Sequence, residues 1–491
     1  MCPSGIAVKS NHPSSHLQVG FITLGCAKNL VDSEKMLAVL AEAGLVLVGS
    51  DDPADAVIIN TCGFIAEARE EARENIEYCL ERKRAGQIGC VIVAGCLAQY
   101  RGEKLIEQFP DIDAVVGLAQ RDKIAQIVRR VVGDSRKTSG KIESGSSSRA
   151  IIQTGPFDGQ VLNDRARLRI TEPCWAYLRI SEGCDRKCTF CTIPVIRGPL
   201  RSKPPEAVIE EARELVGDGA VELNLIAQET SSYGIDLGYE PGLTGLLREM
   251  NNIEELRWLR VLYAHPATLS EAQIAAFAEC EKVAPYIDLP LQHINDRILK
   301  LMNRRIDREG TEQLIKKLRR TIDNLTIRTT MLVGFPTETD REFEELLEFV
   351  RECRFEVVGC FMYSAEEGTS AARIKGQIAQ ETKQQRFEQL MQAQQEIAFG
   401  HGEALIGTRL PCLITGELPE QDVKAMKLDA NQQWFVARHI GQAPEIDSEC
   451  YLGAEPQMDT EPGVIVSAII TERREYDLVG RIDSREYHPL G

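Results

Sequence analysis

Short apolar runs alternate with helical segments along most of this chain, and this alternation restricts its fold more than any other feature. Between residues 19 and 132 the apolar runs are VGFITLG, AVIINT and CVIVAG, and segments such as EAREEARENIEYCLERKR lie between them. Alternation of this kind is typical of a parallel sheet covered by helices. We therefore expect residues 18–132 to form an α/β domain built on a parallel sheet.

A second series of strand–helix units, with a longer cycle, extends over residues 170–402. In the segment DREFEELLEFVREC, residues Phe343, Leu347 and Val350 recur at helical spacing and predict one apolar face. Six such units are too few for an eight-unit barrel, so we expect a partial (β/α)6 barrel with ligands at the carboxyl ends of its strands. The strand candidates are residues 175–181, 221–228, 256–264, 286–292, 327–335 and 356–364.

The remaining segments differ from both series in composition. Residues 1–17 are polar and predict a tail, and residues 133–169 include the stretch GDSRKTSGKIESGSSSRA, which predicts a flexible linker. Residues 403–491 contain short β-like runs such as RLPCLIT and GVIVSAII, separated by turn residues and without a strong helical pattern. This pattern predicts a small antiparallel β-barrel.

Charge and cysteine content narrow the function classes. The chain has 57 Lys+Arg and 74 Asp+Glu, a net charge of −17, which argues against a protein that mainly coats nucleic acid. Its 15 cysteines cannot all pair with one another because the number is odd. The first residues lack the apolar core of a signal peptide, and no apolar run approaches the ~20 residues of a membrane span. We expect a reducing, cytoplasmic setting, in which clustered cysteines more often bind metal than form disulfides.

Three cysteines, Cys184, Cys188 and Cys191, stand close together in EGCDRKCTFCTIP, directly after a predicted strand. A zinc site needs a fourth ligand to complete its tetrahedron, and neither zinc-finger nor zinc-ribbon spacing is present. Three thiolates suit a [4Fe–4S] cluster with one iron open to another ligand, and the alternatives are a structural zinc loop or unligated thiols. We favour the cluster because the motif lies at the mouth of the predicted barrel.

A second set of three cysteines follows the strands of the N-terminal domain. Cys26, Cys62 and Cys96 come directly after FITLG, VIINT and VIVAG. The carboxyl ends of neighbouring parallel strands lie ~5 Å apart, so these thiols can converge in space. On the residues alone, the set fits either a second [4Fe–4S] cluster or three buried cysteines of the core.

Four motifs together resemble the radical S-adenosylmethionine methylthiotransferase family. The resemblance extends from about residue 18 to residue 480 and implies an N-terminal cluster domain, a radical S-adenosylmethionine core and a C-terminal TRAM domain. It also implies that Cys26, Cys62 and Cys96 bind a second [4Fe–4S] cluster. Many members have Pro in place of Ala27 and Asp in place of Glu229, and both departures leave the cysteines intact. The motifs are LGCAKNLVDSE (24–34), NTCGFI (60–65), AGCLAQ (94–99) and GCDRKCTFC (183–191).

The family has two main branches with different substrates. One methylthiolates an adenosine of tRNA, and the other, the RimO branch, methylthiolates the β-carbon of an aspartate in ribosomal protein S12. The segments LIAQETSSYG (225–234) and QAPEIDSECYL (442–452) resemble the RimO branch. Residues 403–491 contain 16 Asp+Glu and 8 Lys+Arg, a net charge of −8. An acidic barrel suits a basic ribosomal protein better than tRNA, although the whole chain is acidic as well.

The resemblance implies a division of labour between two clusters. Replacing an unactivated C–H bond by C–S–CH₃ requires a radical, because no side-chain base removes such a proton at neutral pH. The cluster of the radical core would cleave S-adenosylmethionine to a deoxyadenosyl radical, and the N-terminal cluster would present sulfur. A second S-adenosylmethionine would supply the methyl group, and both open irons would face one shared cavity. An electron donor such as a flavodoxin-type reductant would be needed, and neither a membrane nor tRNA is an expected partner.

Further cofactor contacts are expected in the loops after the barrel strands. Gln228 and Glu229 follow the second strand, where family members hold the methionine amine with polar groups. Gln292 and His293 follow the fourth strand, and Gly334 in GFPTET follows the fifth, where it would shape the adenine pocket. The alternatives are plain loop polarity, a structural histidine and an ordinary turn.

Two other functions stay open on the sequence. A tRNA adenosine methylthiotransferase would bind tRNA tightly and with a strong salt dependence. A non-catalytic iron–sulfur electron carrier or binding protein would not cleave S-adenosylmethionine after reduction.

Overall fold

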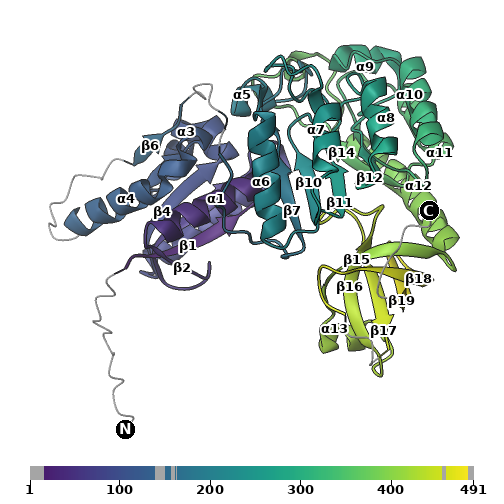
Figure 1. Cartoon of the computed structure of the whole chain (residues 1–491). Coiled ribbons are helices and arrows are strands. Elements are labelled where there is room, and N and C mark those ends of the chain that lie inside the picture. The colour runs from purple at the N-terminus through teal and green to yellow at the C-terminus, as the bar shows by residue number, and fades with distance from the viewer. Residues whose placement is uncertain (1–15, 139–149, 156–160, 162, 456–459, 485–491) are drawn as a thin grey trace, which may run out of the picture. The chain divides into compact units, whose positions relative to one another are not determined.

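The chain divides into two compact units in the computed structural model (Figure 1). Residues up to Pro156, together with Ala166–Leu168, form the first unit, and residues 157–165, together with Arg169 onward, form the second. Residues 1–15 of the expected tail and parts of the expected linker lie outside the described residues. The structure describes residues 16–138, 150–155, 161, 163–455 and 460–484.

The first unit contains a parallel six-stranded sheet, which confirms the fold expected from the alternation. The strand order is β2-β1-β3-β4-β5-β6, and every pairing is parallel. The strands are β1 (Gln18–Thr23), β2 (Val46–Val48), β3 (Ala54–Thr61), β4 (Ile88–Gly95), β5 (Ala114–Val116) and β6 (Ile151–Gln153). The helices are α1 (Ala27–Glu42), α2 (Ala66–Arg84), α3 (Cys96–Gln108), the 3₁₀ helix η1 (Leu118–Lys123) and α4 (Ile124–Thr138).

Part of the segment expected as a linker is regular structure. The end of α4 and all of β6 fall between residues 133 and 169. Strand β6 pairs with β5, and it extends the sheet by one strand. The short apolar pair Ile151–Ile152 is the only sequence signal for it, and a strand of three residues is too brief to show a period.

Helices cover both faces of the first sheet. Ile58 of β3 packs with Leu40 of α1 and Val128 of α4 in one buried cluster. The next residue, Ile59, packs with Ile76 of α2 in a second cluster. Because successive residues of a strand point to opposite faces, a strand buried on both sides is apolar throughout. This explains why β3 and β4 are continuous apolar runs in the sequence.

The second unit contains an open barrel of six parallel strands, as expected. The strands follow one another in chain order from β7 to β14, and each pairs in parallel with the next. They are β7 (Trp175–Arg179), β10 (Glu222–Ile226), β11 (Trp258–Val261), β12 (Val283–Asp288), β13 (Thr326–Val333) and β14 (Val357–Met362). A separate two-stranded sheet joins β8 (Ser181–Glu182) and β9 (Arg201–Ser202).

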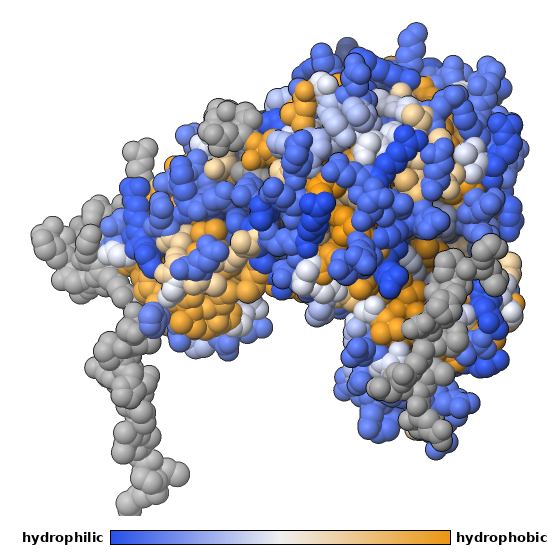
Figure 2. Space-filling view, in the orientation of Figure 1, coloured by the Kyte–Doolittle hydropathy of each residue, from blue (hydrophilic) through white to orange (hydrophobic). Residues whose placement is uncertain are grey.

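Helices enclose the outer face of this barrel. Helix α11 shows why: it begins with a capping box between Thr339 and Glu342, and Phe343, Leu347 and Val350 are buried as the spacing predicts. Figure 2 shows mainly hydrophilic residues on the exposed side of the outer helices. The helices are α5 (Ile193–Arg197), α6 (Pro205–Gly217), α7 (Gly242–Met250), α8 (Glu271–Glu279), α9 (Asp296–Met302), α10 (Arg308–Thr321), α11 (Asp340–Cys353) and α12 (Gln380–Leu405), with the 3₁₀ helix η2 (Ala371–Arg373).

A closed five-stranded barrel follows α12. Four of its pairings are antiparallel, as expected, but β17 and β19 pair in parallel. The reason is geometric, because a ring with an odd number of strands cannot alternate direction at every step. A short helix, α13 (Glu420–Ala425), also interrupts the β-rich sequence. The strands are β15 (Arg409–Glu417), β16 (Gln433–His439), β17 (Cys450–Ala454), β18 (Ile465–Arg474) and β19 (Asp477–Ser484).

No helix among the described residues combines the length and the apolar character that crossing a membrane requires.

Candidate functional site

The cysteine loop of the barrel follows β8 at the carboxyl end of the sheet. Gly183 opens the loop with a φ of +77°, and its Cα lies so close to the carbonyl of Pro199 that a side chain would clash. The amide of Cys184 donates to the carbonyl of Gly198 at 3.1 Å, and that of Cys191 donates to the carbonyl of Cys188 at 3.2 Å. These bonds fold residues 184–191 into a compact loop with three thiols.

Burial shapes the chemistry of these thiols. Burial is the main cause that raises the pKa of Cys184 to about 11 and that of Cys191 to about 12, and the neighbouring thiols contribute to both increases. Iron binding therefore has to displace protons from them. Among the described residues, no three Cys, His, Asp or Glu side chains converge on one point as a mononuclear metal site requires. A cube-shaped cluster would bind thiolates at separate corners, so it would not require such convergence.

Two arginines lie against this loop. Nη1 of Arg304, in the segment after α9, lies 3.6 Å from the sulfur of Cys188. Arg186, inside the cysteine motif, donates from Nη2 to Ser232 at 2.6 Å and from Nε to Glu229 at 3.4 Å. The positive charges therefore lie beside thiols that become thiolates when they bind metal.

Gln228 and Glu229 lie beside the cysteine loop, at the carboxyl end of β10. The amide of Gln228 donates to Glu182 at 2.8 Å, and its carbonyl oxygen is buried without a partner. Glu229 is 4% exposed and accepts hydrogen bonds from Ser231 and from Thr268. The Gln228 carbonyl is thus an unused acceptor, which suits an ammonium group such as the methionine amine.

Two hydrogen-bond donors without partners also lie near the cysteine loop. Nδ1 of His265 accepts from the amide of Ala267 at 3.2 Å, which leaves the proton on Nε2, and this atom is buried without a partner. Burial, with Arg304 and Arg186 nearby, lowers the His265 pKa to about 2, so the ring is neutral. Nε of Arg304 is also buried and unpartnered. One acceptor and two donors without partners match an amino acid moiety with its ammonium and carboxylate.

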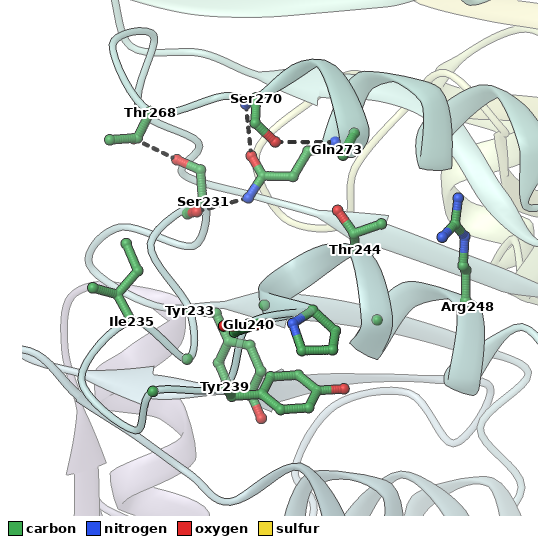
Figure 3. A pocket seen from close by; sticks show the side chains of 16 residues that line it. Ser231, Tyr233, Ile235, Tyr239, Glu240, Thr244, Arg248, Thr268, Ser270 and Gln273 are labelled. Carbon is green, nitrogen blue, oxygen red and sulfur yellow. Dashed lines mark hydrogen bonds between the residues drawn. The ribbon is translucent and has the colours of Figure 1, made fainter.

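A cavity of about 630 Å³ is lined by α7, α8 and the loop after β10. Figure 3 draws the side chains that line it. Ser231 and Thr268, which both contact Glu229, are at its edge. The side chain of Gln273 caps α8 together with Ser270 and donates to the carbonyl of Ser231 at 2.8 Å. The first turn of α8 therefore fixes the hydroxyl that orients Glu229.

The other residues expected to contact the cofactor also have contacts within the fold. Gln292 has a φ of +75° and forms an isolated bridge with Met331. His293 is fully buried and lies 3.4 Å from Glu338, which fits the structural alternative. Gly334 has a φ of +71°, and its Cα packs against the side chain of Lys383 of α12. Contacts of Gln292 and Gly334 with a cofactor stay predictions.

The structure brings the three N-terminal cysteines together at the carboxyl edge of the first sheet. Cys26 precedes α1, Cys62 follows β3, and Cys96 begins α3. A Cβ on Gly25 would lie 3.2 Å from the sulfur of Cys62, and a Cβ on Gly63 would lie 3.2 Å from the carbonyl carbon of Cys96. The three cysteine segments thus touch one another, as the parallel strand order predicts.

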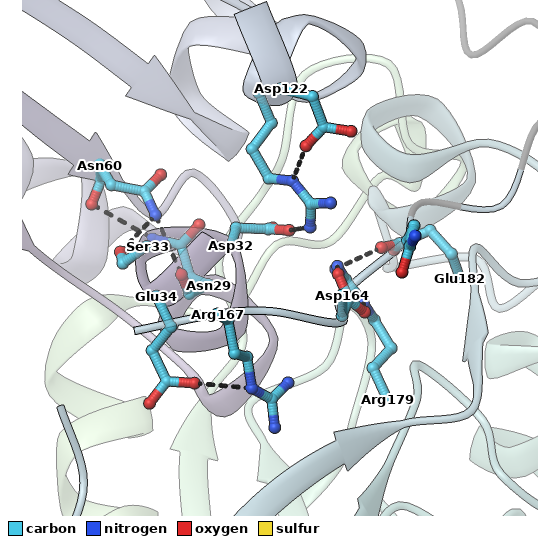
Figure 4. A network of polar contacts seen from close by, with 12 residues as sticks. Asn29, Asp32, Ser33, Glu34, Asn60, Asp122, Asp164, Arg167, Arg179 and Glu182 are labelled. Carbon is cyan, nitrogen blue, oxygen red and sulfur yellow. Dashed lines mark hydrogen bonds and ion pairs between the residues drawn. The ribbon is translucent and has the colours of Figure 1, made fainter. Parts of the chain in front are cut away.

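A buried polar network supports this edge of the first unit (Figure 4). Asn60 donates to the hydroxyl of Ser33 at 2.7 Å and to the carbonyl of Asn29 at 2.9 Å. Asp32 pairs with Arg121 at 3.1 Å. The motif KNLVDSE therefore ties the start of α1, directly after Cys26, to the strand that carries Cys62.

A corresponding network lies within the second unit. Glu182 accepts from Arg179 at 2.8 Å and from Arg197 at 2.9 Å, and Asp164 accepts from Arg179 at 2.6 Å. Figure 4 draws Asp164, Arg179 and Glu182 together. Glu182 also accepts from Gln228, so the network links the start of the cysteine loop to the end of β10.

Sequence reasoning missed several residues of the site. Arg186 lies within the cysteine motif, so its position in the sequence could have indicated that it belongs to the site. His265 and Arg304 carry no comparable signal, because each lies in a loop far from the motif in sequence. Their importance depends on atoms left without partners, which only the folded chain reveals.

Three family models match separate regions of this chain. Residues 18–117 match the uncharacterized protein family UPF0004, residues 178–350 the Radical SAM superfamily and residues 406–482 the TRAM domain. The structure is also similar to the radical S-adenosylmethionine methyltransferase TsrM from Kitasatospora setae, with a TM-score of 0.48 and 14% identity over 71% of this chain and 75% of that one.

Two relatives extend the match over almost the whole chain. The ribosomal protein uS12 methylthiotransferase RimO of Thermoanaerobacter sp. is 41% identical over 94% of this chain and 99% of its own length. RimO of Symbiobacterium thermophilum is 38% identical over 94% of this chain and 90% of its own length. The chain belongs to the RimO family of radical S-adenosylmethionine methylthiotransferases.

Proposed function

We propose that this protein replaces a β-hydrogen of an aspartate in ribosomal protein uS12 by a methylthio group, with S-adenosylmethionine and two [4Fe–4S] clusters. One observation carries the proposal: the chain has two separate trios of cysteines, each at the carboxyl end of a parallel sheet, within a sequence of the RimO family. Each trio leaves one position of a cluster open for chemistry.

Cys184, Cys188 and Cys191 would hold the first cluster, which supplies reductive cleavage of S-adenosylmethionine and so a radical able to take an unactivated hydrogen. The protein residues around it bind and orient the cofactor. The unpartnered carbonyl of Gln228 would accept from the methionine amine, and the unpartnered Nε2 of His265 would donate to its carboxylate. These contacts satisfy buried polar atoms that otherwise cost stability.

Cys26, Cys62 and Cys96 would hold the second cluster, which would supply sulfur for the bond to the substrate carbon. The network around Asn60 and Ser33 keeps their loops in place, so the thiols are positioned before metal binds. We propose a reduced flavodoxin-type protein as the electron donor and the cytoplasm as the setting. The net charge of −8 in residues 403–491 disfavours tRNA as the substrate, because phosphate contacts need a basic surface.

The decisive experiment combines reconstitution with variants. Anaerobic reconstitution with iron and sulfide, then reduction with S-adenosylmethionine and a peptide containing the target aspartate, should add the mass of SCH₃ in place of H at that aspartate. Cys62→Ala should reduce the iron content from about eight to about four atoms per chain and abolish the mass gain while S-adenosylmethionine cleavage continues.

Cys79→Ala is the matched control, since Cys79 is fully buried within α2 and belongs to neither trio. This variant should retain about eight irons and the modification. Modification of tRNA in place of the peptide, or unchanged iron content in Cys62→Ala, would refute the proposal.

A further inference from the structure

A second cavity lies within the second unit, between the open barrel and the five-stranded barrel. Its volume is about 730 Å³. Helix α12 forms one wall, the first residues of β13 and β14 form another, and the loop 439–448 and the start of β19 complete it. Because β13 and β14 begin here, the cavity lies at the end of the sheet opposite to the cysteine loop.

The lining of this cavity is acidic. It includes the carboxylates of Glu356, Asp447, Glu475 and Asp477, and no described lining residue is Lys or Arg. Glu356 and Asp447 have partners in the fold, since Arg319 and Arg328 lie 3.4 Å and 3.7 Å from them.

Glu475 and Asp477 flank the turn between β18 and β19. Arg473 pairs with the carboxylate of Glu403 at 3.0 Å and donates to the backbone carbonyl of Glu475 at 2.8 Å, and Arg474 pairs with Glu472 at 2.9 Å. Asp477 accepts from the amide of Glu449 at 3.0 Å, and among the described residues no ion pair joins these two arginines to the carboxylates of Glu475 and Asp477. The mouth of the cavity therefore has negative charge available for a ligand.

The cavity also contains an unused acceptor. Gln394 of α12 is 3% exposed, and its amide donates to the carbonyl of Phe355 at 3.1 Å. Its Oε1 atom is buried without a partner. A buried acceptor of this kind needs a donor from the occupant of the cavity. Met391, Leu405 and Leu410 supply apolar walls around it.

We propose that this cavity binds a Lys- or Arg-bearing segment of the ribosomal protein substrate, remote from the aspartate that is modified. This inference rests on the proposed function. Lys and Arg combine an apolar stem with a cationic donor, so they match apolar walls, carboxylates and an open acceptor together. Proteins that bind ribosomal RNA are rich in these residues because phosphate contacts require them.

The position of the cavity sets its role. It lies away from the cysteine loop, so a segment bound there increases the affinity for the whole protein and leaves the chemical step unchanged. The Michaelis constant for intact uS12 should therefore depend on the cavity, whereas kcat and the turnover of a short peptide around the aspartate should not.

Ala404 provides the test, because it lines the cavity and is exposed near the end of α12. Ala404→Arg places a cation at the mouth of the cavity, and Ala404→Glu places an anion at the same position. Ala404→Arg should raise the Kd and KM for intact uS12 about fivefold relative to Ala404→Glu, more at low salt than at high salt. Glu475→Gln should weaken binding in the same direction.

Glu420→Gln is the control for net charge, since it changes the charge by the same +1 as Ala404→Arg, on an α13 side chain that is 93% exposed and does not line the cavity. It should leave binding unchanged. Equal affinity of Ala404→Arg and Ala404→Glu for intact uS12, with peptide turnover intact, would overturn the cavity proposal alone. A wild-type enzyme that leaves the short peptide unmodified would instead overturn the proposed function.

Discussion

Glu222 is the most informative single position for the stability of the second unit. This first residue of β10 is fully buried, and its two carboxylate oxygens face two buried arginines. Oε1 accepts from Nε of Arg260 on β11 at 3.0 Å, and Oε2 accepts from Nη2 of Arg438 on β16 at 2.5 Å. One carboxylate therefore bridges two cations and joins the open barrel to the five-stranded barrel.

The electrostatics of this triad favour an ionised carboxylate. Burial opposes ionisation of Glu222, but Arg438 and Arg260 outweigh it and lower its pKa. A carboxyl with a lowered pKa stabilises the fold above its unfolded pKa, and this contribution is lost as the pH falls through the folded pKa. At neutral pH the triad therefore contributes fully.

Glu222→Gln should destabilise the protein by about 4 kcal/mol. Removing one partner of a buried ion pair costs about 3–5 kcal/mol, because the remaining charge is left buried. Here two guanidinium groups lose their counter-charge, although the glutamine oxygen still accepts one hydrogen bond. For a unit of this size, about 2 °C per kcal/mol gives a decrease in Tm of roughly 8 °C.

Thermal unfolding of the metal-free protein, followed by circular dichroism, measures this effect. Glu255→Gln is the control, because Glu255 is exposed, and its Tm should stay within about 1 °C of wild type. Replacing Glu222, Arg260 and Arg438 together by Met should recover most of the lost stability, since buried ion triads can be exchanged for apolar residues. If Glu222→Gln and Glu255→Gln unfold at the same temperature, the triad does not stabilise this junction.

Three further changes test other parts of the structure. Gly334→Ala should lower Tm, because the residue has a φ of +71° and contacts Lys383, and the resulting backbone strain costs about 1–3 kcal/mol. Alanine in place of an exposed glycine with a negative φ should leave Tm unchanged. Asp32→Asn should remove one of the two carboxylates that pair with the buried Arg121, the other being Asp122, and destabilise the first unit by about 2 kcal/mol in urea unfolding; an unchanged midpoint would contradict a stabilising role of the Asp32 ion pair. His265→Phe should weaken S-adenosylmethionine binding about tenfold in equilibrium titration of the reconstituted protein without lowering its iron content, and equal affinity would show that Nε2 does not contact the cofactor.

The sequence predicted the sheets and the placement of both cysteine trios because these depend on local pattern. Apolar runs such as AVIINT mark buried parallel strands, and a residue directly after such a run must lie at the carboxyl edge of the sheet. The apolar stripe of α11, with Phe343 and Val350, follows from spacing alone.

The sequence did not predict features that depend on distant segments. Glu222 and Arg438 are 216 residues apart, and neither position differs from an ordinary surface charge in the sequence. The side-chain amide of Gln228 donates a hydrogen bond to Glu182, so only the side-chain carbonyl of Gln228 is left for a ligand. The helix α13 was missed because six residues are too few to show an amphipathic period.

The parallel pairing of β17 with β19 has a consequence for biosynthesis. Strand β19 comes after every other strand of its barrel and bridges β17 and β18, so the ring stays open until this stretch has emerged. A nascent or truncated chain that stops before Asp477 exposes two unsatisfied strand edges at once, and such edges recruit other chains into aggregates. Premature termination in the last part of the message should therefore yield insoluble product instead of a shortened enzyme.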